Sequence, residues 1–367
     1  MKIAVTGSNG FIGKNLCAVL REHDHYEVYE INRDTSEKDF QAYLSNADFL
    51  FHLAGVNRPQ EISEFGVGNV DLTKLVVETL QRFKRNIPIV LSSSAQVELD
   101  NPYGKSKLEA EEVIQNYSES TGASHYIYRL PNVFGKWCKP NYNSFIATFC
   151  NNIMNGSEIS INDPNSPVNL VYIDDVCESW LEILTGRVKP GFKKVPVVFN
   201  TTVGEVAEII GSFKSSKTTL ITEPVGKGLY RALYATYLSY THPENFSYKL
   251  VSHKDERGVF CEMLKTHNSG QFSFFTAHPG VTRGGHYHHT KAEKFLVIKG
   301  KAKFGFRNIL SGEKHSITTS EDYPEIVDTV PGWSHDITNV GSDDLVVMLW
   351  ANEIFNPEKP DTQAAIV

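Results

Sequence analysis

The feature that most constrains this 367-residue chain is a glycine-rich turn close to its N-terminus. Residues 2–6 (KIAVT) form a short apolar run that stops at Gly7, and residues 11–20 (FIGKNLCAVL) then place apolar side chains at helical spacing. Further glycines, Gly10 and Gly13, recur at intervals of three after Gly7. Glycine lets a backbone approach an anion closely, so this strand, turn and helix predict a dinucleotide site with its pyrophosphate at the helix N-terminus.

Strand and helix patterns continue to alternate beyond the turn. Apolar runs end at Arg33 and Gly55 and recur as IPIVLSSS and SHYIYRLP, and helix-like segments over 71–85 and 104–120 lie between such runs. This alternation predicts an α/β Rossmann-type domain, a doubly wound parallel sheet with helices on both faces.

The texture of the sequence changes after about residue 242. Helical periodicity fades, and short strand-like runs such as FSFFTAH, EKFLVIKG and DLVVMLWANE follow one another closely. We interpret this part as an all-β barrel, with THPENF as the linker. Because single hydrophobic cores stop growing at roughly 250 to 300 residues, we expect two domains. Their expected ranges are 1–243 and 246–367.

Composition and charge argue against several classes of protein. The N-terminus does not read as a signal peptide, and no apolar window reaches the roughly 18 residues of a membrane span, so we expect a cytoplasmic protein without membrane contact. The five cysteines contain no CxxC pair, which fits a reducing compartment. With a net charge of −7 and no basic block, nucleic acid is not an expected partner.

The end of the second apolar run bears on the choice of cofactor. Arg33 stands where an acidic residue would bind the ribose 2′-hydroxyl of NAD, and its charge suits the 2′-phosphate of NADP(H). The adjacent Asp34 opposes that choice, and an ordinary surface role for Arg33 is the alternative.

Two side chains at the start of a predicted helix suit proton transfer. Tyr103 and Lys107 are four residues apart, so the phenol and the ammonium lie on one helix face, where the cation would stabilise phenolate. Ser94, at the end of the LSSS run, would hydrogen-bond the same substrate oxygen. A solvated Tyr–Lys pair without a catalytic role is the alternative.

These motifs resemble those of the extended short-chain dehydrogenase/reductases. The resemblance rests on TGSNGFIG, HLAG at 52–55, SSS at 92–94, YGKSK at 103–107, RLPNVFG at 129–135 and VYIDDV at 171–176. It implies that Asn132 faces a sugar nucleotide. The eight residues between Ser94 and Tyr103 are few for this family, so Ser92 and Ser93 stay open as alternatives. The expected cofactor-binding residues are Gly7, Asn9, Gly10, Phe11, Ile12, Gly13, Arg33, Leu53, Ala54 and Gly55.

Histidines and a glutamate in the second half are spaced like metal ligands. His286 and His288 stand at i and i+2 of a predicted strand and so point to one side, and Glu293 and His335 follow later in the chain. We predict that these four residues bind a divalent cation, zinc or another first-row metal. Alternatives are His289 as a ligand and a metal-free barrel with surface histidines.

The barrel also resembles two known groups of proteins. GVTRGGHYHHTKAEKFLVIKG matches the first cupin motif, and PGWSH followed by Asn339 matches the second more loosely. DERGVFCE and RGGHY resemble segments of the deoxysugar 3,5-epimerases, which remove a proton beside a ketone. His286 stands at both their base position and a metal position, so the base stays open, with His289 as one candidate. The substrate-binding residues that this resemblance implies are Arg257, Glu262 and Arg283. A barrel that only orders a dimer or binds nucleotide is the alternative.

Over nearly its whole length the chain resembles the bifunctional capsular polysaccharide biosynthesis enzymes that form UDP-2-acetamido-2,6-dideoxy-L-talose, on the route to N-acetyl-L-fucosamine. The resemblance implies C3 epimerisation of a UDP-4-keto-6-deoxy-N-acetylhexosamine by the barrel and reduction at C4 with NADPH. Tyr103 would supply the proton, with its pKa lowered by Lys107 and the oxygen oriented by Ser94. A homodimer is expected. Alternatives are a dTDP-4-keto-6-deoxyhexose reductase with an inert barrel and a regulatory NADP sensor that binds metal.

Overall fold

The structure, a computed structural model, describes the chain except residues 251–252, 256–257, 261–263, 267–269 and 354–355. It forms two compact units, of which the first comprises Met1–Phe145 and Pro167–Thr201 and the second Ile146–Ser166 and Thr202–Val367. Within the described part of the chain, every helix is too short or too polar to cross a membrane. The expected domain boundary near the THPENF segment stays a prediction.

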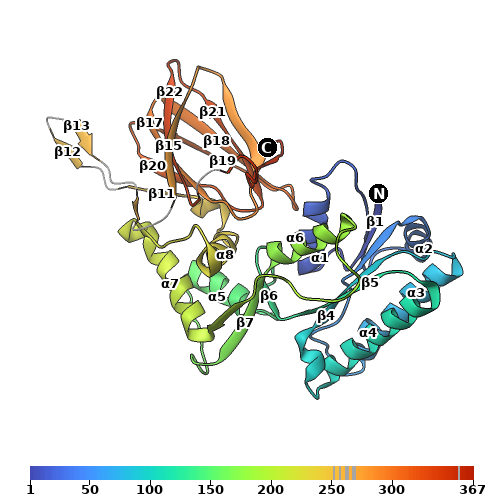
Figure 1. Ribbon diagram of the computed structural model, residues 1–367. Coiled ribbons are helices and arrows are strands. Elements are labelled where there is room, and N and C mark those ends of the chain that lie inside the picture. Colours follow the sequence, from blue (N-terminus) through green and yellow to red (C-terminus); the bar gives the residue numbers. More distant parts are fainter. Residues whose placement is uncertain (251–252, 256–257, 261–263, 267–269, 354–355) are drawn as a thin grey trace. The chain divides into compact units, whose positions relative to one another are not determined.

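The first unit contains a six-stranded parallel sheet with the order β2-β1-β3-β4-β5-β8 (Figure 1). Its strands are β1 (Lys2–Thr6), β2 (Glu27–Ile31), β3 (Phe49–His52), β4 (Ile89–Ser94), β5 (His125–Leu130) and β8 (Gly191–Lys193). A smaller sheet contains β6 (Asn132–Phe134), β7 (Pro167–Tyr172) and β9 (Phe199–Thr202). The predicted α/β class and the first predicted strand and helix are confirmed.

Helices cover both faces of the large sheet (Figure 1). They are α1 (Phe11–Leu20), α2 (Glu37–Asn46), α3 (Leu72–Arg82), α4 (Pro102–Thr121) and α6 (Ile173–Leu184), with short η1 (Gly66–Asp71) and η2 (Ala95–Glu98). One core joins sheet residues such as Leu50 and Ile127 to Val76 of α3 and Ile114 of α4. On the other face, Trp180 of α6 packs against aromatic rings of the sheet. Burial of these apolar faces stabilises the layers and leaves the strand ends open.

The strand order reverses at β1, because β2 lies on one side of it and β3 on the other. Ligands of open parallel sheets bind at such a reversal, beyond the carboxyl ends of the strands. Gly7 follows the end of β1, and Leu53 follows the end of β3. The fold therefore brings the glycine turn and the HLAG segment to this point.

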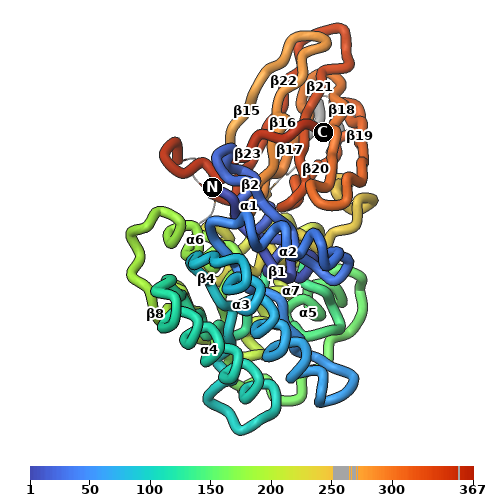
Figure 2. Tube along the Cα trace, turned by 90° about the vertical axis from the view of Figure 1, so that its right-hand side faces the viewer, coloured from blue at the N-terminus to red at the C-terminus, as the bar shows by residue number. Residues whose placement is uncertain are grey.

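The second unit contains two five-stranded antiparallel sheets, with the orders β11-β20-β17-β22-β15 and β19-β18-β21-β16-β23 (Figure 2). Phenylalanines, valines and Trp333 from both sheets form its core. The sheet strands are β11 (Ser247–Lys249), β15 (Gln271–Ala277), β16 (Thr282–Tyr287), β17 (Glu293–Lys299), β18 (Lys301–Asn308), β19 (Lys314–Ser320), β20 (Glu325–Asp328), β21 (Trp333–Asn339), β22 (Leu345–Ala351) and β23 (Gln363–Ala364). The predicted all-β architecture is confirmed.

Helices also belong to this unit. They are α5 (Phe145–Met154), α7 (Val203–Thr219) and α8 (Gly228–Leu238), and the THPENF segment holds the short helix η3 (Pro243–Asn245). Two strand pairs complete it, β10 (Ile221–Thr222) with β14 (Lys265–Thr266), and β12 (His253–Asp255) with β13 (Gly258–Phe260). The helices α7 and α8 precede the barrel in sequence, but they belong to the same compact unit as its strands.

Candidate active site and metal centre

The glycine turn is shaped by close backbone contacts. Gly7 has a φ of +71°, and a β-carbon there would lie 2.8 Å from the backbone of Ala54. A β-carbon on Gly13 would collide with the carbonyl oxygen of Gly7. The N-cap residue of α1 is Gly10, which has no side chain to occupy the free N–H groups of the first turn. The exposed Asn9, Gly10 and Gly55 leave this turn open to a phosphate group.

A buried hydrogen-bond network supports the turn from below. The Thr6 hydroxyl oxygen accepts the N–H groups of Leu53 and Ala54, both at 3.2 Å. The same oxygen lies 2.7 Å from His52 Nδ1, and His52 Nε2 lies 2.9 Å from the Thr73 hydroxyl. Burial, together with the charge of Lys107, lowers the pKa of His52 to about 3, so its ring is neutral. Sequence reasoning assigned no role to Thr6 or His52.

Arg33 lies where the sequence placed it, on the turn that follows β2. Its side chain is exposed, and the Asn32 side chain accepts the N–H of Asp34 at 2.9 Å within that turn. The N–H of Ser8 donates to the carbonyl of Ile31 at 3.2 Å, which ties the glycine turn to the end of β2. The 2′-phosphate role of Arg33 stays a prediction.

Tyr103 and Lys107 lie in the first turns of α4, as expected. The Asn101 side chain caps this helix by accepting the N–H of Gly104 at 2.7 Å. Burial raises the pKa of Tyr103, and a hydrogen bond with Ser94 acts in the opposite direction. Burial also lowers the pKa of Lys107 to about 8, against the charge of Glu111. The pKa of the Tyr103 phenol is thus raised on balance, whereas the sequence predicted that Lys107 lowers it. The effect of Lys107 on this pKa stays a prediction.

The three adjacent serines have different surroundings. Ser94 contacts Tyr103, whereas the hydroxyl of Ser93 donates to the buried carboxylate of Glu111. Glu111 also pairs with Arg129 at 2.8 Å. This geometry supports Ser94 rather than Ser93 as the partner of the phenol. Glu111 follows Lys107 by four residues, so helical spacing was the signal that could have placed it at the site.

Asn69 is a buried residue that sequence reasoning missed. It lies on η1, which is a π-helical turn, a feature frequent at functional sites. Its side chain accepts the N–H of Val56 at 2.7 Å and donates to the hydroxyl of Ser106 at 2.9 Å. It therefore links the segment after Gly55 to the helix that carries Lys107. No pattern in the sequence distinguishes this asparagine from others.

In the second unit, the structure brings the four predicted metal ligands together. His286 on β16 pairs directly with His335 on β21, His288 follows β16, and Glu293 begins β17. One ligand atom from each of these residues lies within 4.8 Å of the other three. Glu293 Oε2 is 3.2 Å from His288 Nε2 and 3.4 Å from His335 Nε2.

The electrostatics of this cluster suit a cation. Burial alone would raise the pKa of Glu293, but contacts with His288 and His335 hold it well below the usual range. Burial and the two neighbouring histidines lower the pKa of His286 to about 4, so that ring is neutral. Neutral imidazoles and one carboxylate are the donors that first-row divalent metals prefer. The donor set therefore fits a metal ion.

The remaining predicted residues have varied positions. Arg257 and Glu262 lie outside the described residues. Arg283 on β16 is exposed, with its guanidinium 5.1 Å from the ring centre of Phe275. Asn132 on β6 is exposed. His289 lies outside the four-residue cluster, and its ring contacts Tyr287.

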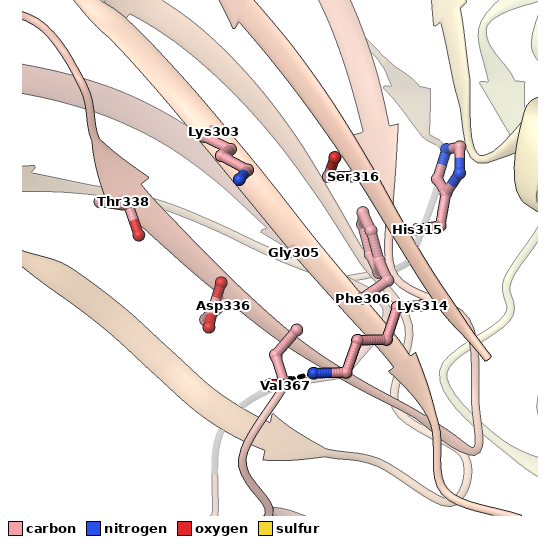
Figure 3. Close-up of a pocket in the computed structure, with 9 residues that line it drawn as sticks. All are labelled: Lys303, Gly305, Phe306, Lys314, His315, Ser316, Asp336, Thr338 and Val367. Atoms are coloured by element: carbon pink, nitrogen blue, oxygen red, sulfur yellow. Dashed lines mark hydrogen bonds between the residues drawn. The ribbon is translucent and has the colours of Figure 1, made fainter. Parts of the chain in front are cut away.

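A separate hollow lies on the barrel, shown in Figure 3. Its volume is about 430 Å³, and residues of β18, β19 and β21 line it together with the C-terminal Val367. Lys314 Nζ lies 3.4 Å from the carbonyl oxygen of Val367. None of its nine lining residues belongs to the four-residue cluster, so it is distinct from the candidate metal centre.

Two family models match the two parts of this chain. The model of the NAD dependent epimerase/dehydratase family matches residues 3–193. The chain belongs to this family. The model named Polysaccharide biosynthesis C-terminal domain matches residues 253–363. The chain is thus an NAD(P)-dependent enzyme of the oxidoreductase and epimerase class, an extended short-chain dehydrogenase/reductase joined to a C-terminal barrel.

Two relatives match this chain over its whole length, and a third matches only part of it. The UDP-2-acetamido-2,6-β-L-arabino-hexul-4-ose reductase of Pseudomonas aeruginosa is 53% identical over 368 residues, which cover 100% of this chain and 99% of that protein. The crystal structure of the capsular polysaccharide assembling protein CapF from Staphylococcus aureus is 43% identical, with a TM-score of 0.69 and full coverage of both chains. UDP-glucuronic acid 4-epimerase from Bacillus cereus, at 18% identity and a TM-score of 0.53, covers 59% of this chain and 84% of its own and shares the fold.

Proposed function

We propose that this enzyme uses NADPH to reduce C4 of a UDP-4-keto-6-deoxy-N-acetylhexosamine, coupled to epimerisation at C3 by the barrel. The product would be UDP-2-acetamido-2,6-dideoxy-L-talose, for capsular polysaccharide biosynthesis on the route to N-acetyl-L-fucosamine. The name of the Pseudomonas relative, a UDP-sugar reductase, supports the substrate class. The observation that carries the proposal is the contact of Ser94, at the end of β4, with Tyr103. Tyr103 lies on α4, the helix that also holds Lys107.

The reductase chemistry divides among few residues. The open turn around Gly10 would hold the pyrophosphate, and Arg33 would bind the 2′-phosphate. NADPH held there would supply the hydride chemistry that reduction of the C4 ketone requires. Tyr103 would donate its proton to the ketone oxygen, Ser94 would hydrogen-bond that oxygen, and the Lys107 ammonium would favour the phenolate left behind. Burial raises the pKa of Tyr103, which favours the neutral phenol, the form that donates a proton.

The barrel would contribute the epimerase step. His286, His288, Glu293 and His335 would hold a divalent cation, with zinc as our first choice. A divalent cation bound there supplies Lewis-acid stabilisation of negative charge on a ketone oxygen. The ketone that acidifies C3–H is the group later reduced, which is a chemical reason for both activities in one chain. Arg283, with Arg257 and Glu262, would contact this substrate, and Asn132 would contact it in the first unit. We further propose a cytoplasmic homodimer.

The decisive experiment uses Tyr103→Phe. Wild-type protein should oxidise NADPH when given the UDP-4-keto sugar, and Tyr103→Phe should lower kcat by about 10² to 10⁴-fold while the Kd for NADPH stays unchanged. Undiminished turnover by Tyr103→Phe would refute the reductase assignment. The solvent-exposed Tyr323→Phe is the matched control.

The epimerase step has its own test. In D₂O without NADPH, wild-type protein should introduce deuterium at C3 of the keto sugar, as NMR of the recovered sugar would show. His288→Ala should lose this exchange together with its metal, whereas Tyr103→Phe should retain it. Exchange at the wild-type rate by metal-free His288→Ala would refute the metal-assisted step.

A further inference from the structure

One residue of the C-terminal segment makes an unusual set of contacts with the loop between two candidate metal ligands. The carboxylate of Asp361 accepts the N–H groups of His289, Thr290 and Lys291 at 3.0, 2.8 and 2.7 Å. It also accepts the hydroxyl of Thr290 at 3.0 Å. All three residues lie between the ligands His288 and Glu293.

The backbone of the same residue contacts a ligand directly. The carbonyl oxygen of Asp361 lies 2.6 Å from Nδ1 of His288. A carbonyl oxygen accepts and never donates, so Nδ1 must carry the proton. In the neutral ring, Nε2 is then a bare lone pair, and it faces Glu293 Oε2 at 3.2 Å. Two acceptors at this distance need either a shared metal ion or a second proton on the ring between them.

The conformation and charge of Asp361 indicate that this arrangement is firmly held. Its φ of +40° lies in the left-handed region, which aspartate tolerates better than most side chains. Its carboxylate accepts three N–H groups and one hydroxyl, and hydrogen bonds to a carboxylate are roughly twice as strong as those between neutral groups.

A further contact extends the network. Arg231 on α8 donates to the Thr290 hydroxyl, the group that donates to Asp361. Arg231 also lies 3.4 Å from Glu353. Thr290, in the loop from His288 to Glu293, is thus held both by α8 and by the C-terminal segment.

We propose that Asp361 is a positioning residue of the metal centre, whose carbonyl oxygen sets the tautomer of His288 and whose carboxylate holds the backbone between His288 and Glu293. This inference rests on the proposed metal centre. It assigns the segment before β23 a part in metal binding, although Asp361 is itself no ligand. Partners that hold the second nitrogen of a metal-bound histidine typically change metal affinity by about 10 to 100-fold.

The test compares Asp361→Gly with wild-type protein. Glycine accepts the left-handed φ and keeps the carbonyl oxygen in the chain, but it removes the carboxylate that pins it. We expect competition with a chromophoric chelator to show Zn²⁺ binding weakened at least about tenfold. Asp361→Asn keeps one acceptor oxygen, so its Zn²⁺ affinity should lie between those of wild-type protein and Asp361→Gly. Glu358→Gln, an exposed acid in the same segment, is the matched control and should bind as wild type does.

A second readout separates positioning from general support of the fold. Tm is measured for each variant in excess chelator and in excess Zn²⁺. Positioning predicts that the gap between the two Tm values narrows in Asp361→Gly. An unchanged gap, or equal Zn²⁺ affinity, would overturn the role of Asp361 and leave the metal centre standing. Wild-type protein that takes up no Zn²⁺ would overturn both.

Discussion

The side chain of Ser94, at the end of β4, interacts with the phenol of Tyr103, in the first turn of α4, and opposes the rise in the pKa of the phenol that burial causes. The short connection between them contains η2. The N–H of Gln96, in the first turn of η2, donates to the hydroxyl oxygen of Ser94 at 3.2 Å. The compact turn thereby compensates for the small number of residues between the two groups.

Replacement of this serine tests its role. Ser94→Ala should lower kcat for the keto sugar by about 10² to 10³-fold, because one donor to the developing oxyanion is lost. KM for NADPH should stay unchanged. Steady-state kinetics with Ser92→Ala as the matched control would decide between the neighbouring serines. A larger loss in Ser92→Ala than in Ser94→Ala would contradict the assignment.

The exposed Arg33 predicts the preference for NADPH. Arg33→Ala should raise KM for NADPH about tenfold, equivalent to roughly 1.4 kcal/mol, and leave KM for NADH unchanged. Asp34→Asn, its neighbour, should lower KM for NADPH, because a negative charge beside the 2′-phosphate disappears. Equal effects of Arg33→Ala on both cofactors would show that the side chain does not read the phosphate.

His52 predicts a specific dependence of stability on pH. Its folded pKa of about 3 lies below its ordinary value of 6.5, so the unfolded chain binds a proton in that interval and the folded chain does not. The contribution of His52 to the free energy of unfolding is fully present above pH 6.5. It decreases by about 1.4 kcal/mol per pH unit as the pH falls toward 3. Denaturant unfolding of wild type and His52→Asn between pH 6 and 4 should give slopes that differ by about this amount. Parallel slopes would contradict a neutral buried ring.

A buried ion pair in the second unit predicts a large loss of stability. Lys294 Nζ lies 2.7 Å from Asp328 Oδ1, and both side chains are 4% exposed. Asp328→Asn leaves the ammonium without its counter-charge, at a cost of about 3 to 5 kcal/mol in the free energy of unfolding. The double variant Lys294→Met/Asp328→Leu removes both charges and should be much less destabilised. Urea unfolding checks this, and a double variant no more stable than Asp328→Asn would contradict it.

Local patterns predicted a large part of the first unit correctly. The predicted helices over 71–85 and 104–120 correspond to α3 and α4, because their apolar spacing and the Asn101 cap act within a few residues. The strand, turn and helix at the N-terminus agree with β1 and α1 for the same reason. Close steric limits at Gly7 and Gly13 explain why glycine spacing was informative.

Long-range packing determined properties that local sequence patterns cannot predict. The sequence placed Tyr103 and Lys107 on one helix face, but burial, which tertiary packing creates, moved the pKa of the phenol upward. Long-range packing also groups α7 and α8 with the strands that follow them in the second compact unit.

The sequence by itself determined the elements, the glycine turn and the identities of the four candidate ligands, because short-range spacing on strands and helices sets which side chains share a face. Only the tertiary structure decided which distant groups support them. Asp361 lies 73 residues from His288, and no local periodicity links the two. Their contact exists because the chain returns along the barrel and places a half-buried carboxylate where three backbone N–H groups need an acceptor.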